Sequence, residues 1–336
     1  MFRPQFEVAL GSLILNNEKN ENIDSILIEQ STEIPSDNLI VLLANDEKHP
    51  TFSIKKGDKA SASLGYHNEE MEQLFTGTID SVESDINTTR ISCMTSMINL
   101  CRLRTDLFFE QQTSGFIVKE LLKLAQVEAD EGGPSDGILF PFYAIDSNTN
   151  AFEHVKKLSR LNGFVTYMNN MDKFVFKKFD PKKTHTIEYG KDIIHVTRIK
   201  QTLESKSVEV YGESPSSSMG SDTAHWLTKK QVKGESPISA EDGNGEAGRA
   251  LLVYERVLKD DEMASHVAKA AANRLNLSEM VGIRIAGNQK IMLGHAVELK
   301  NIPDDSLNGK YQIRDISHAL NKGSGFITLL KCIGPL

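Results

Sequence analysis

Apolar and polar residues alternate with period two through much of the chain, and this constrains the fold more than any other feature. In the first hundred residues the pattern recurs at 39–43, 60–64, 74–82 and 91–94. Successive side chains of a strand point to opposite faces, so each segment predicts a strand with one buried face. Many short strands at close spacing predict an antiparallel β-barrel-like domain over residues 1–104.

Residues 105–182 change to a mixed helical and extended pattern. Thr113 and Asn150 are placed to cap two helices that each carry an apolar stripe. Gly163 is a suitable stop for the second helix, and a hairpin follows over 164–176. We therefore expect a small α+β domain here.

The period-two pattern returns after the α+β domain and is interrupted once. We assign 183–211 and 277–336 to a second β-barrel-like domain. Between them, residues 212–276 predict a flexible insertion rich in Gly, Ser, Pro and acidic residues, followed by an alanine-rich helix. The predicted class is α+β, mostly β, with two antiparallel β-barrel-like domains flanking a small α+β domain.

The two β regions share a local glycine pattern. Gly57 opens one strand and Gly77 precedes the next, while Gly294 and Gly309 stand in the same positions of the later region. Glycine suits points where the backbone turns sharply or takes a positive φ. The pattern indicates either two related domains or merely the common use of glycine before strands.

Composition excludes several classes of protein. The formal net charge of −8 argues against a dedicated nucleic-acid binder, which needs a basic surface. The three cysteines form no disulfide framework, which favours synthesis in a reducing cytoplasm. We find no signal peptide and no stretch of 18 apolar residues, so we expect no membrane insertion.

Two motif-like patterns in the predicted insertion lack the context that their chemistry needs. One is a G-x-G-x-x-G pattern that follows no strand, and the other is the start of a calcium loop that fails at its later positions. They consist of Gly243, Gly245 and Gly248, and of Asp242, Asn244 and Glu246. We expect neither to bind a ligand.

Histidines, cysteines and lysines give no clearer site. His154 and His266 lie on predicted helices without a second ligand at helical spacing. A basic run predicts a solvated linker, or a contact with nucleic acid if it lines a channel; it comprises Lys177, Lys178, Lys182 and Lys183. We predict no catalytic, cofactor-binding or metal-binding residue and no enzymatic activity.

The order of these features resembles the late control protein D family of phage tails. That family also includes the central hub of contractile phages and the N-terminal hub region of type VI secretion spike proteins. The most specific segment combines a glycine-led strand, an N-G-x-Y strand, His318 and a closing strand after Gly323 and Gly325. The segments that carry the resemblance are 75–84, 149–176, 207–215 and 291–330.

The resemblance implies a structural baseplate hub of a phage tail or contractile injection system. Three copies would form a ring that joins a sixfold tail tube to a threefold spike. The chain ends without an appended spike module, so the spike would be a separate protein, and other baseplate proteins would be further partners. DNA or effectors would pass through the channel only as cargo. The resemblance implies no cofactor. We expect the hub in the virion tail or injection particle.

Two other interpretations belong to different classes. The protein could be a tail-associated cell-wall hydrolase, although no hydrolase domain is recognisable. It could instead be a receptor- or carbohydrate-binding protein at the tail tip, for which an aromatic groove is expected. The chain has a single tryptophan, Trp226, and it lies in the predicted insertion.

Overall fold

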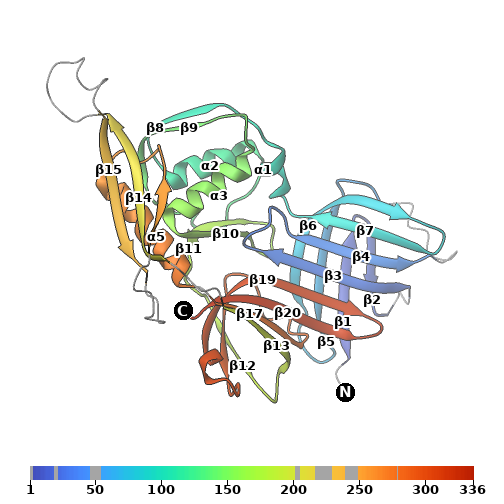
Figure 1. Cartoon of the computed structure of the whole chain (residues 1–336). Helices are drawn as coiled ribbons and strands as arrows, with labels where there is room; N and C mark the ends of the chain where they lie inside the picture. The colour runs from blue at the N-terminus through green and yellow to red at the C-terminus, as the bar shows by residue number, and fades with distance from the viewer. Residues whose placement is uncertain are drawn as a thin grey trace.

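Thirteen strands form one sheet in the computed structural model, which describes residues 3–18, 22–45, 54–200, 205–215, 229–238, 249–277 and 279–336. Most neighbouring strands are antiparallel and helices are few, so the predicted class, mostly β with an α+β part, is confirmed. In the described part of the chain the sheet does not close into a barrel. The two expected barrel-like regions are instead two lobes of one open sheet (Figure 1).

Lobe 1 is built from seven consecutive strands, all paired antiparallel, in the order β2-β1-β5-β6-β7-β4-β3. Alternate residues of each strand point into a single core, as the period-two pattern predicts. The strands are β1 (Pro4–Leu10), β2 (Leu13–Asn16), β3 (Ile23–Ser31), β4 (Asn38–Ala44), β5 (Lys59–Tyr66), β6 (Glu72–Ser84) and β7 (Thr88–Met94).

Lobe 2 continues the sheet from β3 and is assembled from strands that are far apart in sequence. Its order is β19-β20-β17-β13, with β18 beside β19 and β12 paired in parallel with β18. The strands are β12 (Thr184–Glu188), β13 (Ile193–Lys200), β17 (Glu279–Ala286), β18 (Ala296–Lys300), β19 (Gly309–Asn321) and β20 (Gly325–Gly334), with the 3-10 turn η1 (Asp305–Leu307).

In the part of the chain that the structure describes, the α+β unit packs three small sheets and four helices around a third core. Its first part comprises α1 (Ile98–Arg102), β8 (Leu107–Thr113), α2 (Ser114–Leu124), β9 (Leu139–Ile145), α3 (Ala151–Asn162), β10 (Phe164–Met168) and β11 (Phe174–Lys178). Its second part comprises β14 (Ser205–Pro215), β15 (Lys229–Pro237), β16 (Arg249–Tyr254) and α5 (Asp261–Asn276).

Local signals placed the helix ends well. The Thr113 hydroxyl accepts a hydrogen bond from the Phe116 amide at 3.2 Å, and the Asn150 side chain accepts one from the Glu153 amide at 3.0 Å. Gly163 ends α3 with a left-handed φ of 67°. None of the described helices combines the length and apolar character needed to cross a membrane.

The expected positions of 205–215, 229–237 and 249–254 need correction. β14 pairs with β15 and β16 rather than with lobe 2, and its Val208 and Val210 belong to the core of the α+β unit. A Cβ at Gly212 would lie 2.4 Å from the Leu258 carbonyl, and one at Gly234 would lie 2.2 Å from Ala264. These glycines let the sheet approach α5 and its preceding turn closely. Glycines that suggested a loop in the sequence therefore allow close packing of a sheet on a helix.

Candidate functional site at the junction of three units

The two lobes meet where β3 and β19 pair side by side, from Ser31 opposite Asp315 to Ser25 opposite Asn321 (Figure 1). Beside this seam, the side chain of Phe326 on β20 of lobe 2 packs in the core of lobe 1. The centroid of its ring lies 5.6 Å from that of Tyr66. The lobes therefore share core packing as well as a strand ladder.

His318 is fully buried on β19 at the same seam, 5.9 Å from the Phe326 ring. Its Nε2 lies 3.2 Å from the Ile291 carbonyl, which can only accept, so Nε2 carries the proton and donates it. Its Nδ1 then accepts from the Thr328 hydroxyl at 3.0 Å. Burial lowers the pKa of His318 to about 4, so the ring is neutral at physiological pH.

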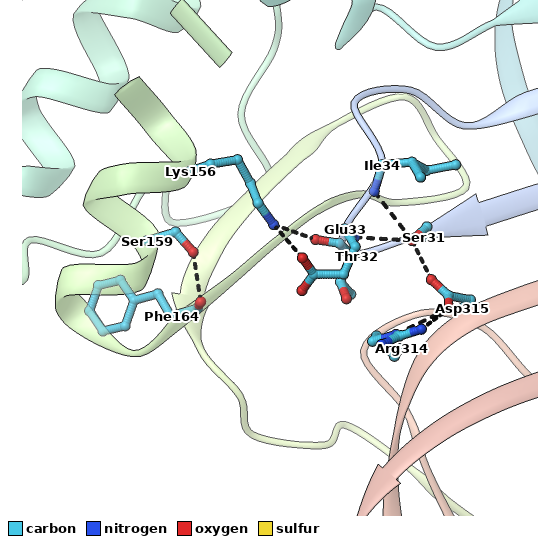
Figure 2. A network of polar contacts seen from close by, with 9 residues as sticks. All are labelled: Ser31, Thr32, Glu33, Ile34, Lys156, Ser159, Phe164, Arg314 and Asp315. Atoms are coloured by element: carbon cyan, nitrogen blue, oxygen red, sulfur yellow. Dashed lines mark hydrogen bonds and ion pairs between the residues drawn. The ribbon is translucent and has the colours of Figure 1, made fainter. Parts of the chain in front are cut away.

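Helix α3 reaches lobe 1 through Lys156, which Figure 2 shows pointing at the segment after β3. Its Nζ donates to the Thr32 carbonyl at 2.9 Å and to the Glu33 carboxylate at 3.3 Å. The lysine is only 6% exposed, and burial lowers its pKa although Glu33 opposes that shift. A buried cation with two acceptors ties the α+β unit to lobe 1.

The same segment is bonded to lobe 2 (Figure 2). The Ser31 hydroxyl donates to Asp315 of β19, and Asp315 also accepts from Arg314 at 2.9 and 3.1 Å. The Thr32 amide donates to the Arg314 carbonyl at 2.9 Å. Residues 31–33 of lobe 1 therefore contact both the α+β unit and lobe 2.

The β10–β11 hairpin contacts all three units. One face places Met168, Phe174 and Phe176 in the core of the α+β unit, and the other places Tyr167 and Val175 in the core of lobe 2. Because side chains alternate across a strand, one short hairpin can serve two cores.

The tip of this hairpin is bonded to lobe 1. The Asn170 side chain donates to the Gln73 carbonyl at 2.8 Å, and the Asn170 carbonyl accepts from the Thr76 hydroxyl at 2.7 Å. Asp172 accepts from the Ser96 amide at 2.8 Å and from its hydroxyl at 3.0 Å. The hairpin is thus held at its tip and on both faces.

A buried acid lies close to this contact. Asp37 is fully buried and accepts from the Ser31 amide at 3.0 Å. Burial raises its pKa to about 8, and the charge of Asp172 adds to the increase. At neutral pH the protonated, uncharged form of Asp37 therefore predominates.

A small cavity of about 110 Å³, lined by both polar and apolar side chains, lies among the three units. Gln30 lines it from lobe 1, Asn169 from the hairpin and His295 from lobe 2, with Lys182 and Asp130 nearby at 4.0 Å from each other. Its mixed donors and acceptors suit ordered water that would bridge the units.

These contacts make the junction a mechanical site. It fixes the relative positions of two sheets and a helical unit through shared cores, buried hydrogen bonds and one buried cation. It contains no arrangement of nucleophile, base and oxyanion donor that we recognise. Across the described ranges, no three His, Cys, Asp or Glu side chains gather into a metal-binding group.

A family model described as the Alg8 N-terminal domain matches residues 16–322. The chain belongs to this family. The sequence matches none of the curated proteins.

Solved structures show which fold this Alg8 N-terminal domain family member has. A 43 kDa tail protein of prophage MuSo2 from Shewanella oneidensis superposes with a TM-score of 0.71 at 15% identity, covering 98% of each chain. A tail protein from Neisseria meningitidis gives 0.70 at 12%, covering 98% of this chain and 96% of that one. An E. coli component of the type VI secretion system gives 0.60 at 9%, covering 98% and 76%. The fold is that of these proteins.

The residues considered from the sequence lie mostly outside the junction. His154 is buried on α3 and bonds to the Thr149 hydroxyl at 2.8 Å, whereas His266 is exposed on α5. Lys182 lines the cavity and Lys178 is exposed at the end of β11. The glycine and calcium-loop patterns and Trp226 lie outside the described residues.

Sequence reasoning missed most of the junction. His318 was part of the most specific segment, yet nothing in the sequence indicated its position at a seam. Lys156 was hidden because one lysine on an amphipathic helix is normally solvated. A signal did exist, since Lys156 and Ser159 share the α3 face of Phe152 and Val155 instead of the polar face.

Proposed function

We propose that this Alg8 N-terminal domain family member is a structural baseplate hub of a phage tail or related contractile injection system, similar to late control protein D. Three copies form a ring that joins a sixfold tail tube to a separate threefold spike. Each chain contributes two β lobes, so the ring presents six β units to the tube. Its role is to fix interface geometry, without catalysis.

The observation that carries this proposal is the single open sheet that contains both lobes. In the described residues its main path ends at β2 on one side and at β13 on the other, each with a ladder partner on one side only. Unpaired edges promote association, and head-to-tail contacts between different edges close a ring. The junction supports the role because it prevents the lobes from moving relative to each other.

The exposed apolar side chains agree with an assembly role. Ile194 and Ile199 of β13 are each 57% exposed at one end of the sheet. Ile14 of β2 is 56% exposed at the other end. Large apolar side chains at both edges are typical of surfaces that a neighbouring chain covers.

Light scattering on the purified protein, alone and with its spike protein, tests the proposal. We expect a species of three chains. An Ile199→Lys variant, with a charge on the β13 edge, should shift this species toward monomer. Ile86→Lys, on the 94% exposed turn after β6, is the matched control and should remain trimeric. A wild-type protein that stays monomeric with the spike present would contradict the hub assignment.

A further inference from the structure

The three-stranded sheet of β15, β14 and β16 has one face packed on a helix and one face toward solvent. Helix α5 covers the first face, where Gly212 and Gly234 allow close packing. The other face carries Leu252 and Tyr254, which are 67% and 53% exposed. Figure 1 draws β14 and β15 at the end of the molecule farthest from lobe 1. The second face is therefore accessible to a ligand from outside.

Two tyrosines stand next to each other on this exposed face. Tyr211 of β14 and Tyr254 of β16 are direct partners in the parallel pairing of the two strands. They line an open hollow of about 260 Å³ together with Gly212, Leu252 and Val253. We call it the tyrosine hollow. Its lining combines two aromatic rings with an exposed aliphatic side chain.

Carboxylates bind the phenol groups beside the tyrosine hollow. The Tyr211 hydroxyl donates to Glu209, and the Tyr254 hydroxyl donates to Glu213. A carboxylate has about four acceptor positions, so one hydrogen bond does not exhaust it. The tyrosine oxygens can also accept. The apolar lining is thus bordered by groups that accept hydrogen bonds from hydroxyl groups of a ligand.

The size of the tyrosine hollow favours a small ligand over a protein. Specific protein–protein interfaces use roughly 20–30 residues on each side, whereas five residues line this hollow. Pockets for drug-sized molecules measure roughly 300–1,000 Å³, and the volume here is about 260 Å³. One six-membered ring with its substituents suits this space.

Charge narrows the class of ligand further. Among the described side chains next to the tyrosines, Glu209, Glu213 and Glu235 face a single base, Lys233. Its Nζ lies 3.2 Å from Glu209 and 3.5 Å from Glu235. The excess of carboxylates disfavours phosphates and other anions. A cationic ligand is disfavoured in turn because Lys233 Nζ already lies 5.8 Å from the centroid of the Tyr211 ring.

We propose that the tyrosine hollow binds a neutral saccharide. The C–H faces of a sugar ring are apolar and pack against Tyr211, Tyr254 and Leu252. The hydroxyls of the sugar donate to Glu209 and Glu213, which replace the water that they lose on binding. The protein then recognises a glycan in addition to its role in assembly. This binding does not depend on the hub role, so either proposal can fail without the other.

Saturation-transfer NMR on the full-length protein tests the binding directly. The probes are four neutral sugars, methyl α-glucoside, methyl α-mannoside, methyl β-galactoside and N-acetylglucosamine, with choline as the cationic comparison. We expect transfer to at least one sugar, strongest at the ring C–H protons. The signal should change little between low and high salt because no ion pair forms.

Variants of Tyr254 separate ring packing from hydrogen bonding. Tyr254→Ala removes the ring and should weaken the affinity about tenfold, as expected for loss of an aromatic contact. Tyr254→Phe keeps the ring and should retain most of the affinity. Tyr189→Ala, at a tyrosine that is 48% exposed just after β12, is the matched control and should bind like wild type.

A second position guards against a variant that does not fold, which circular dichroism would detect. Glu213→Gln keeps an acceptor oxygen and removes the charge. A neutral sugar should therefore bind this variant almost as well as wild type, whereas a cationic ligand should bind it much more weakly.

Three outcomes would overturn the proposal. The first is no transfer to any of the four sugars. The second is transfer that Tyr254→Ala leaves unchanged, since the sugar would then bind elsewhere. The third is transfer to choline alone that disappears at high salt and in Glu213→Gln, which would assign the tyrosine hollow to a cation.

Discussion

Lobe 1 and lobe 2 occupy the same sheet but are built in different ways. Lobe 1 is a run of consecutive strands, all antiparallel, within residues 4–94. Lobe 2 combines strands that come before the β14–β15–β16 sheet in the sequence with strands that come after it. It also includes one parallel pair, β12 with β18. Pairing of residues far apart in sequence costs more loop-closure entropy before contacts form. Lobe 2 therefore depends more on its neighbours.

The cores show the same difference. Among the described residues, lobe 1 takes one buried side chain of its core, Phe326, from lobe 2, with the half-buried Met292 and Leu320 packed against the same core. Lobe 2 takes Tyr167 and Val175 from the β10–β11 hairpin. The comparison teaches that the N-terminal lobe supplies a nearly complete framework, whereas the second lobe is completed by the junction.

The largest expected effect comes from Phe326→Ala, which removes the buried ring that lobe 2 contributes to the core of lobe 1. Loss of a buried aromatic ring typically costs ~3–5 kcal/mol because a cavity remains. Denaturant unfolding should show this loss, with Cys93 becoming reactive earlier than in wild type. Phe108→Ala, at a site that is 74% exposed, is the matched control and should cost little. Equal effects of the two substitutions would show that lobe 1 is independent of Phe326.

Asp37→Asn should have an intermediate effect that depends on pH and acts on the lobe 1 side of the junction. The pKa of Asp37 is about 8 in the folded protein and 3.8 in the unfolded chain. The folded protein therefore loses stability as the pH rises through this range, because the buried carboxyl group must ionise. The amide carries no charge and can still accept from the Ser31 amide.

Thermal unfolding across pH measures this prediction. The variant should be more stable than wild type at pH 8.5, by a margin that shrinks as the pH falls, and nearly equal to it at pH 4. A stability difference that stays constant over this range would mean that Asp37 is ionised in the folded protein.

The smallest expected effect comes from Lys156→Met, which keeps the buried alkyl chain but removes the donor to Thr32. We expect a loss of about 1 kcal/mol because a buried carbonyl loses its partner, partly offset by removal of a buried charge. Lys157→Met is the control, since its ion pair with Glu255 at 2.8 Å lies within the α+β unit and is partly exposed. Equal losses in chemical denaturation would show that Lys156 contributes no more than a surface pair.

Local chemistry explains which elements could be predicted from the sequence. Thr113, Asn150 and Gly163 each act within one turn of their own helix, so their roles are visible in a short window. Gly57 and Gly294 each stand two residues before a strand, β5 and β18, as predicted, whereas Gly77 lies inside β6 instead of before a strand. The position of β14 could not be predicted in this way, because β14 packs with helix α5, which lies further along the chain.

The sequence by itself determined the mostly β class, the helix ends and the strands whose period-two pattern is strong. Only the tertiary structure decided that both β regions share one sheet and that a hairpin, a lysine and a histidine lie where the three units meet. The physical reason is distance along the chain, since Ser31 bonds to Asp315 across 284 positions. Periodicity records which face of a strand is buried, but it does not record which other strand buries it.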